Sequence, residues 1–150
     1  MKQKLLIYGI GNPARQDDGF GTEVLQQLQN TLIHPNIHYH CNYQLNIEDA
    51  ELFTHYQHII LIDASQKAGG LSLSRLEAEN NMPISSHALS PQQVLALSLS
   101  LYQAKYKCWI VTTTGTQWGL GQELSQTIKS EIKPACLLIH SHISSLGYAV

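Results

Sequence analysis

The chain has 150 residues, of which 43% are hydrophobic and 13% are charged, and its formal net charge at pH 7 is -2. This length and composition are typical of one globular domain, here residues 1–150, that buries a core without needing a metal or a disulfide to fold. A charge so close to neutral excludes nucleic acid as an expected partner. The apolar run before the first glycine is too short for a signal peptide or a membrane span, so we expect a cytoplasmic protein.

The first half of the chain alternates between strand and helix patterns. Residues 4–10 are a short apolar run closed by glycine, which predicts a buried strand, and apolar residues at helical spacing from Phe20 onward predict a helix. A second strand is predicted at 37–43 and a short helix at 47–56. Residues 58–65, HIILIDAS, are the clearest buried parallel strand in the sequence.

The second half continues the alternation. The predicted elements are an edge strand at 71–76, a helix that begins at Ser90-Pro91, a strand at 108–112 and a helix from about Ser125 that contains Pro134. Together the elements predict an α/β fold, a three-layer α/β/α sandwich with a mostly parallel twisted sheet of about five strands. In such sheets ligands bind beyond the carboxyl ends of the strands.

Residues 9–21, GIGNPARQDDGFG, follow the first strand and allow two kinds of ligand. Residues 9–14 satisfy the dinucleotide pattern G-x-G-x-x-G/A, but that pattern needs a helix that starts at the loop and points its amides at a phosphate. Here helical spacing begins only at Phe20, and Asp17 and Asp18 precede it. Because two carboxylates repel phosphate, a cation is the favoured ligand.

A cation site is predicted from Asp18, Asp63 and His87, which three separate loops or strand ends contribute. Two carboxylates and one imidazole suit zinc or nickel, and three ligands leave positions open for water or substrate. Each residue also has a structural interpretation. Asp17 or Asp18 could cap the next helix, Asp63 could be held by backbone amides, and His87 could be a solvated loop residue.

Nucleophilic catalysis is not indicated by the sequence. The pattern G-x-S-x-G does not occur, and Ser85, Ser86 and His87 are too close along the chain to form a triad. The three cysteines are widely separated and have no C-x-x-C spacing, so we expect buried free thiols: Cys41, Cys108 and Cys136.

Four segments together resemble the hydrogenase maturation proteases. GIGNPARQDDGFG resembles their first signature, G-x-G-N, four residues, then D-D/E-x-x-G. HIILIDAS is similar to their second motif, an apolar strand that ends in Asp-Ala, and residues 86–95 are similar to the third, a histidine that leads into a helix. Residues 115–125 resemble the glycine-rich loop before the last helix, with Trp118 at its bulky position. This loop is expected to cap the sheet, and lining a substrate groove is the alternative.

The resemblance implies an endopeptidase that removes the C-terminal extension of a nickel-iron hydrogenase large-subunit precursor after nickel has been inserted. It implies that Asp18, Asp63 and His87 are the nickel ligands and that they act in catalysis through the bound metal. The precursor is expected to carry the nickel, for which zinc or another divalent ion could substitute in vitro. Asp17 is expected to lie behind the ligands or to cap the next helix. Glycines and an asparagine are expected to shape the loop: Gly9, Gly11, Asn12, Gly19 and Gly21.

Several points stay open at this stage. Residues 44–48 depart from the Asp-Gly-Gly-Thr turn that many members carry in a position associated with substrate choice, so the hydrogenase is not identified. The resemblance also does not decide whether nickel takes part in the cleavage reaction or is only recognised by the protease before cleavage. The expected partner is the precursor, with no membrane and no nucleic acid, and the protein is expected to be a monomer. The alternative function is a noncatalytic metal- or nucleotide-binding module on a Rossmann-like scaffold.

Overall fold

A five-stranded sheet forms the centre of the computed structural model, which describes residues 2–79 and 89–150. The strands are β1 (Leu5–Ile10), β2 (Ile37–Asn42), β3 (His58–Ser65), β4 (Ser72–Leu76) and β5 (Lys107–Thr114). Across the sheet their order is β2-β1-β3-β5-β4. Only β4 runs antiparallel to its neighbour among these described strands, which confirms the predicted mostly parallel sheet and the predicted edge strand.

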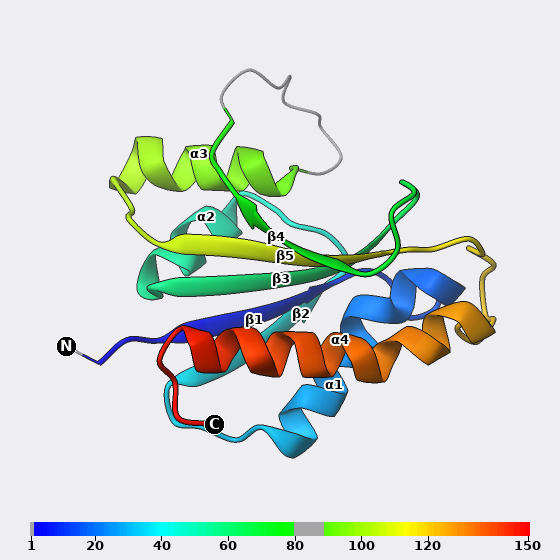
Figure 1. Cartoon of the computed structure of the whole chain (residues 1–150). Coiled ribbons are helices and arrows are strands. Elements are labelled where there is room, and N and C mark those ends of the chain that lie inside the picture. Colours follow the sequence, from blue (N-terminus) through cyan, green and yellow to red (C-terminus); the bar gives the residue numbers. More distant parts are fainter. Residues whose placement is uncertain (1, 80–88) are drawn as a thin grey trace.

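Helices cover both faces of the sheet (Figure 1). The α-helices are α1 (Phe20–Thr31), α2 (Glu48–Leu52), α3 (Pro91–Tyr102) and α4 (Gln126–Ser145), and two 3-10 helices are η1 (Gln16–Gly19) and η2 (Phe53–His55). α1 and α4 pack on one face, and α2 and α3 pack on the other. The three-layer α/β/α architecture is therefore confirmed. No described helix combines the length and the apolar composition that a membrane span requires.

β1 and residues 59–62 of β3 are apolar because both of their faces are buried. In β1, Leu5 and Ile7 face the core under α1 and α4, whereas Leu6 and Tyr8 face the core under α2 and α3. All four side chains are at most 1% exposed. Each fully buried Leu or Ile contributes about 1.5–3 kcal/mol relative to an exposed one, so this double burial fixes the position of the strands and of the loops that follow them.

Several element boundaries differ from the sequence predictions, most of them by one or two residues. The helix predicted at 47–56 is the short α2 followed by η2, which buries Phe53 in the core. The strand predicted at 108–112 is one residue longer at its start and two residues longer at its end, because β5 pairs with β3 as far as Ser65 and Thr114. α4 contains Pro134, as the sequence predicts.

The cysteines are free, but they are not all buried. Cys108 is buried and Cys136 is partly buried, as expected, whereas Cys41 is exposed. The prediction is wrong for Cys41 because it lies near the end of the edge strand β2, where four of the six residues are exposed.

Candidate functional site

Two of the three predicted ligands meet at the carboxyl edge of the sheet. Asp63 belongs to β3 and lies opposite Thr112 of β5. Asp18 belongs to η1, which follows β1 and contacts β3. Both carboxylates are half-buried. The third predicted ligand, His87, lies outside the described residues.

Close packing of glycines brings Asp18 to this edge. Gly11 has φ +136°, and a Cβ atom on it would overlap the backbone carbonyl oxygen of Asp18. At the start of α1, a Cβ on Gly21 would lie 2.5 Å from the carbonyl oxygen of Ile62 and 2.7 Å from that of Ile10. The first turn of α1 therefore rests directly on the backbone of β1 and β3, one residue before Asp63.

The loop between β1 and η1 uses its amides internally. The Asn12 N–H donates to Oδ2 of Asp18 (2.8 Å), and the Gly11 N–H donates to the carbonyl oxygen of Asn42 (3.0 Å). The Ala14 N–H donates to the side-chain oxygen of Asn12 (2.9 Å). These three amides would have to face the phosphates in a dinucleotide loop, but here they hold Asp18 and the loop itself in place.

Asp63 has an unusual electrostatic environment for an acid. Burial raises its pKa from 3.8 to about 7, and the charge of Asp18 adds to the increase, while a hydrogen bond from the Ala64 amide opposes it. η1, which carries Asp18, contacts β3, which carries Asp63, so the charge of one acid acts on the other. In the described ranges the ion pairs are Arg75–Glu77 and Lys129–Glu123, so neither acid has a cationic side chain as its partner there.

Two neighbouring acids of this kind favour a cation as ligand over an anion. Two carboxylates that repel each other are stabilised when a divalent ion lies between them. Within residues 2–79 and 89–150 the structure shows no group of three or more Asp, Glu, His or Cys side chains able to hold a metal. Among the described residues, this edge of the sheet therefore has two carboxylates and no third potential metal ligand grouped with them.

Asp17 does not cap α1, which was one of the two roles expected from the sequence. The residue before α1 is Gly19, and the Asp17 carboxylate points instead to the loop that follows β5. It accepts hydrogen bonds from the Thr116 and Gln117 amides (3.0 Å each) and from both the amide (2.9 Å) and the hydroxyl (3.0 Å) of Ser125. Burial alone would raise the pKa of Asp17, but these hydrogen bonds outweigh it and lower the pKa.

A cleft of about 470 Å³ begins at Asp63. It runs between the turn after β3, the edge strand β4 and the start of α3. Its lining is rich in hydroxyl groups and glycines and includes one lysine: Asp63, Ser65, Lys67, Gly69, Gly70, Ser72, Ser74, Gln92, Thr112 and Thr113. Apolar side chains such as Leu76 and Ile110 also line it, and its volume lies within the usual range of ligand-binding clefts.

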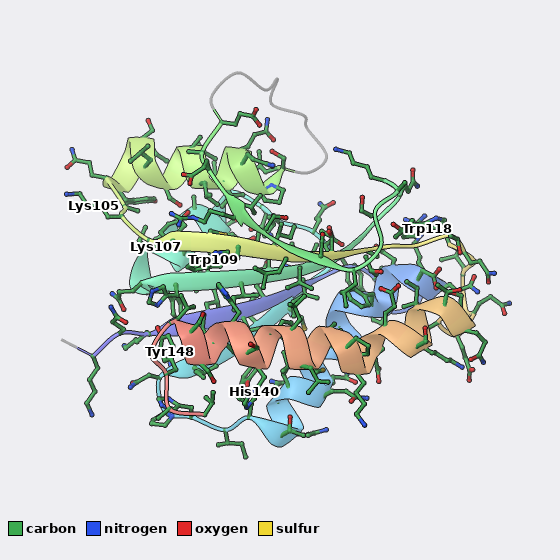
Figure 2. All side chains as sticks on the ribbon, in the orientation of Figure 1. Lys105, Lys107, Trp109, Trp118, His140 and Tyr148 are labelled. Carbon is green, nitrogen blue, oxygen red and sulfur yellow. The ribbon has the colours of Figure 1, made fainter. Side chains whose placement is uncertain are left out.

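Trp118 lies on the loop after β5, at the end of the molecule opposite Tyr148 (Figure 2). Its ring stands against Gly115, where a Cβ atom would be only 2.7 Å away, and it packs on the core under α1 and α4. This contact is a structural one, and it keeps the loop beside Asp17.

Comparison with known proteins finds matches among solved structures. No family model matches the chain, and no curated protein matches it. The solved structures similar to it include the [NiFe] hydrogenase maturation protease HycI from Thermococcus kodakarensis KOD1, with 20% identity, a TM-score of 0.76 and coverage of 95% of this chain and 94% of that one.

Two structures from Escherichia coli agree with this comparison. The hydrogenase maturating endopeptidase HybD has 20% identity and a TM-score of 0.76, and an endopeptidase solved in solution has 21% identity and a TM-score of 0.77. Each alignment covers 97% of this chain and 94% of the other. This chain therefore shares its fold, over nearly its whole length, with solved hydrogenase maturation endopeptidases.

Proposed function

We propose that this protein is a nickel-dependent endopeptidase that removes the C-terminal extension of a nickel-iron hydrogenase large-subunit precursor after nickel insertion. The observation that carries the proposal is the pair Asp18 and Asp63 at the carboxyl edge of the sheet, without a cationic partner in the described residues. The shared fold with hydrogenase maturation endopeptidases supports it.

The nickel is part of the substrate in this proposal. Asp18, Asp63 and His87 would complete the coordination of a nickel ion that the precursor already holds. An incomplete set of protein ligands fits this role, because a closed four-ligand site would bind its own metal and leave no position for the precursor. A bound nickel ion would supply Lewis acidity toward the scissile carbonyl or a water molecule.

The cleft beside Asp63 is the proposed position of the C-terminal extension. An extended segment there would lie along β4 and cross the hydroxyl-lined surface between Ser74 and Thr112. Side chains and backbone in the cleft would orient the scissile peptide relative to the two carboxylates. In this arrangement the chain binds and positions the substrate, and the acids keep the nickel end of the precursor at the sheet edge.

A nucleotide-binding module is a poorer explanation of the same loop. The amides of Gly11, Asn12 and Ala14 already have acceptors within the protein. The carboxylate of Asp18 lies where a phosphate would otherwise approach the Asn12 amide. A phosphate would have to displace that carboxylate and then overcome its repulsion.

The test is cleavage of purified precursor, loaded with nickel or free of it, followed by mass spectrometry. Wild-type protein should shorten only the nickel-loaded precursor, and Asp18→Ala, Asp63→Ala and His87→Ala should each abolish the mass change while remaining folded. Glu123→Ala, which removes an exposed acid from the loop after β5, is the matched control and should cleave normally. Full processing by all three site variants would refute the proposal. Wild-type protein that binds the metal but shortens no precursor would favour the noncatalytic module.

A further inference from the structure

A dense network of hydrogen bonds joins η1 to the β5–α4 loop, residues 115–125. Besides the four bonds that Asp17 accepts, the Asp17 amide donates to the carbonyl oxygen of Gln117 (3.0 Å). The side chain of Gln16 contributes two more, since its Nε2 donates to Gln117 Oε1 (2.6 Å) and its Oε1 accepts from the Gly119 amide (3.1 Å). These contacts connect segments about 100 residues apart in the sequence.

Asp17 is the centre of this network. It is 0% exposed, and both of its carboxylate oxygens accept hydrogen bonds. Hydrogen bonds to a charged acceptor are roughly twice as strong as neutral ones. Asp17 therefore fixes the position of η1 relative to the loop and to Ser125, the residue that caps the start of α4.

Asp18 is the next residue of the same four-residue helix and has the opposite orientation. Its carboxylate faces Gly11 and Asn12, and its charge acts on Asp63. Its backbone amide donates to the carbonyl oxygen of Arg15, which keeps it within η1. A rotation or shift of η1 would therefore move the Asp18 carboxylate away from the Asn12 amide and from Asp63.

We propose that Asp17 is a positioning residue, which orients Asp18 for cation binding by fastening η1 to the β5–α4 loop. The inference rests on the proposed role of Asp18 as a nickel ligand. Residues that orient metal ligands from behind typically change metal affinity by about 10–100-fold when they are replaced. The Asp17 carboxylate has this relation to Asp18 through the short helix that both share.

The experiment compares wild-type protein with Asp17→Asn in the absence and presence of Ni²⁺ alone. In metal-free protein, the ¹H–¹⁵N signal of the Asn12 amide reports directly on its hydrogen bond to Asp18. We expect Asp17→Asn to shift this signal and to increase the hydrogen exchange rate of the Asn12 amide. We also expect the affinity for Ni²⁺, measured by competition with a chelator, to fall by at least about tenfold.

Asp49→Asn is the matched control for a general loss of stability. Asp49 is another buried acid, which accepts hydrogen bonds from the Tyr8 hydroxyl (3.0 Å) and the Asn46 amide (2.9 Å) and lies on α2. The substitution Asp49→Asn should lower the unfolding temperature while leaving the Asn12 signal and the Ni²⁺ affinity at their wild-type values. Ser125→Ala, which removes only the hydroxyl donor, should move both readouts in the direction of Asp17→Asn by a smaller amount.

An unchanged Asn12 signal in Asp17→Asn, or an unchanged Ni²⁺ affinity beside a changed signal, would overturn the inference. Failure of the proposed function gives a different result: wild-type protein would then not bind Ni²⁺ or would not cleave the precursor. In that case the Asn12 signal alone still decides whether Asp17 positions Asp18.

Discussion

Replacing Asp63 by Asn should stabilise the metal-free protein at neutral pH. The pKa of Asp63 is raised from 3.8 to about 7, first by burial and second by the charge of Asp18. The folded chain therefore keeps a proton over a pH range in which the unfolded chain releases it. By linkage, the stabilising contribution is complete below about pH 4 and is lost as the pH rises to 7.

The magnitude follows from the same two pKa values. Each unit of difference corresponds to about 1.4 kcal/mol, so the increase of about three units gives an upper limit of about 4 kcal/mol. Asn resembles the protonated acid in shape and carries no charge at any pH. The free energy of unfolding of Asp63→Asn should therefore equal that of the wild type near pH 4 and exceed it by up to about 4 kcal/mol at pH 8.

Urea unfolding in the presence of a chelator, at intervals from pH 4 to pH 8, measures this difference. Asp18→Asn is the control, because it removes only the smaller repulsive contribution and should give a smaller gain. A difference between wild type and Asp63→Asn that does not change with pH, or a variant less stable than the wild type at pH 8, would refute the reasoning. Addition of Zn²⁺ or Ni²⁺ should then stabilise the wild type more than Asp63→Asn, since binding to the folded state adds to stability.

Three further predictions concern other parts of the molecule. Gly21→Ala should lower the free energy of unfolding, measured with urea, by about 1–3 kcal/mol or more, because its Cβ would meet the carbonyl oxygen of Ile62. An unchanged free energy of unfolding would contradict the close packing of α1 on the sheet. Ser74→Trp should fill the cleft and raise KM for the nickel-loaded precursor without changing the affinity for Ni²⁺. Ser74→Ala is the control and should leave KM at the wild-type value. Equal KM values for the wild type and Ser74→Trp would exclude the cleft as the peptide site. Burial, with Lys107 and His142 nearby, lowers the pKa of His58, so its contribution to stability is complete above about pH 6.5 and is lost on acidification. His58→Gln should therefore weaken the loss of unfolding free energy at acidic pH. Curves of unfolding free energy against pH that run parallel for the wild type and the variant would argue against this reasoning.

Much of the fold could be predicted from the sequence because burial leaves a clear pattern in it. β1 and β3 are buried on both faces, so they appear as continuous apolar runs, and the polar residue at the end of such a run, Asp63, is conspicuous. The edge strand β4 is less apolar than the central strands, and its leucines divide between the two faces: Leu73 packs on the core under α1 and α4, whereas Leu76 belongs to the core under α2 and α3. The start of α3 was equally clear, since Ser90 and Gln93 form a capping box and Pro91 follows the cap.

The hydrogen-bond partners of Asp17 could not be predicted in the same way. These partners are residues 116, 117 and 125, about 100 positions away. Their donors are mostly backbone amides, which nearly every residue has, so the sequence does not reveal which amides bind Asp17. The local pattern, an acid just before a helix, favoured a cap of α1. The tertiary contact with the β5–α4 loop took precedence because a fully buried carboxylate needs several donors, and that loop provides them.

The two adjacent acids of η1 also differ in the substitutions that they can tolerate. Asp17 is enclosed on all sides, so a side chain longer by one methylene group would not fit among its donors. Asp18 is only half-buried and faces the open edge of the sheet, where a longer acid could still reach a cation. Asp17→Glu is therefore expected to disturb the packing of η1 on the β5–α4 loop, whereas Asp18→Glu is expected to leave it intact.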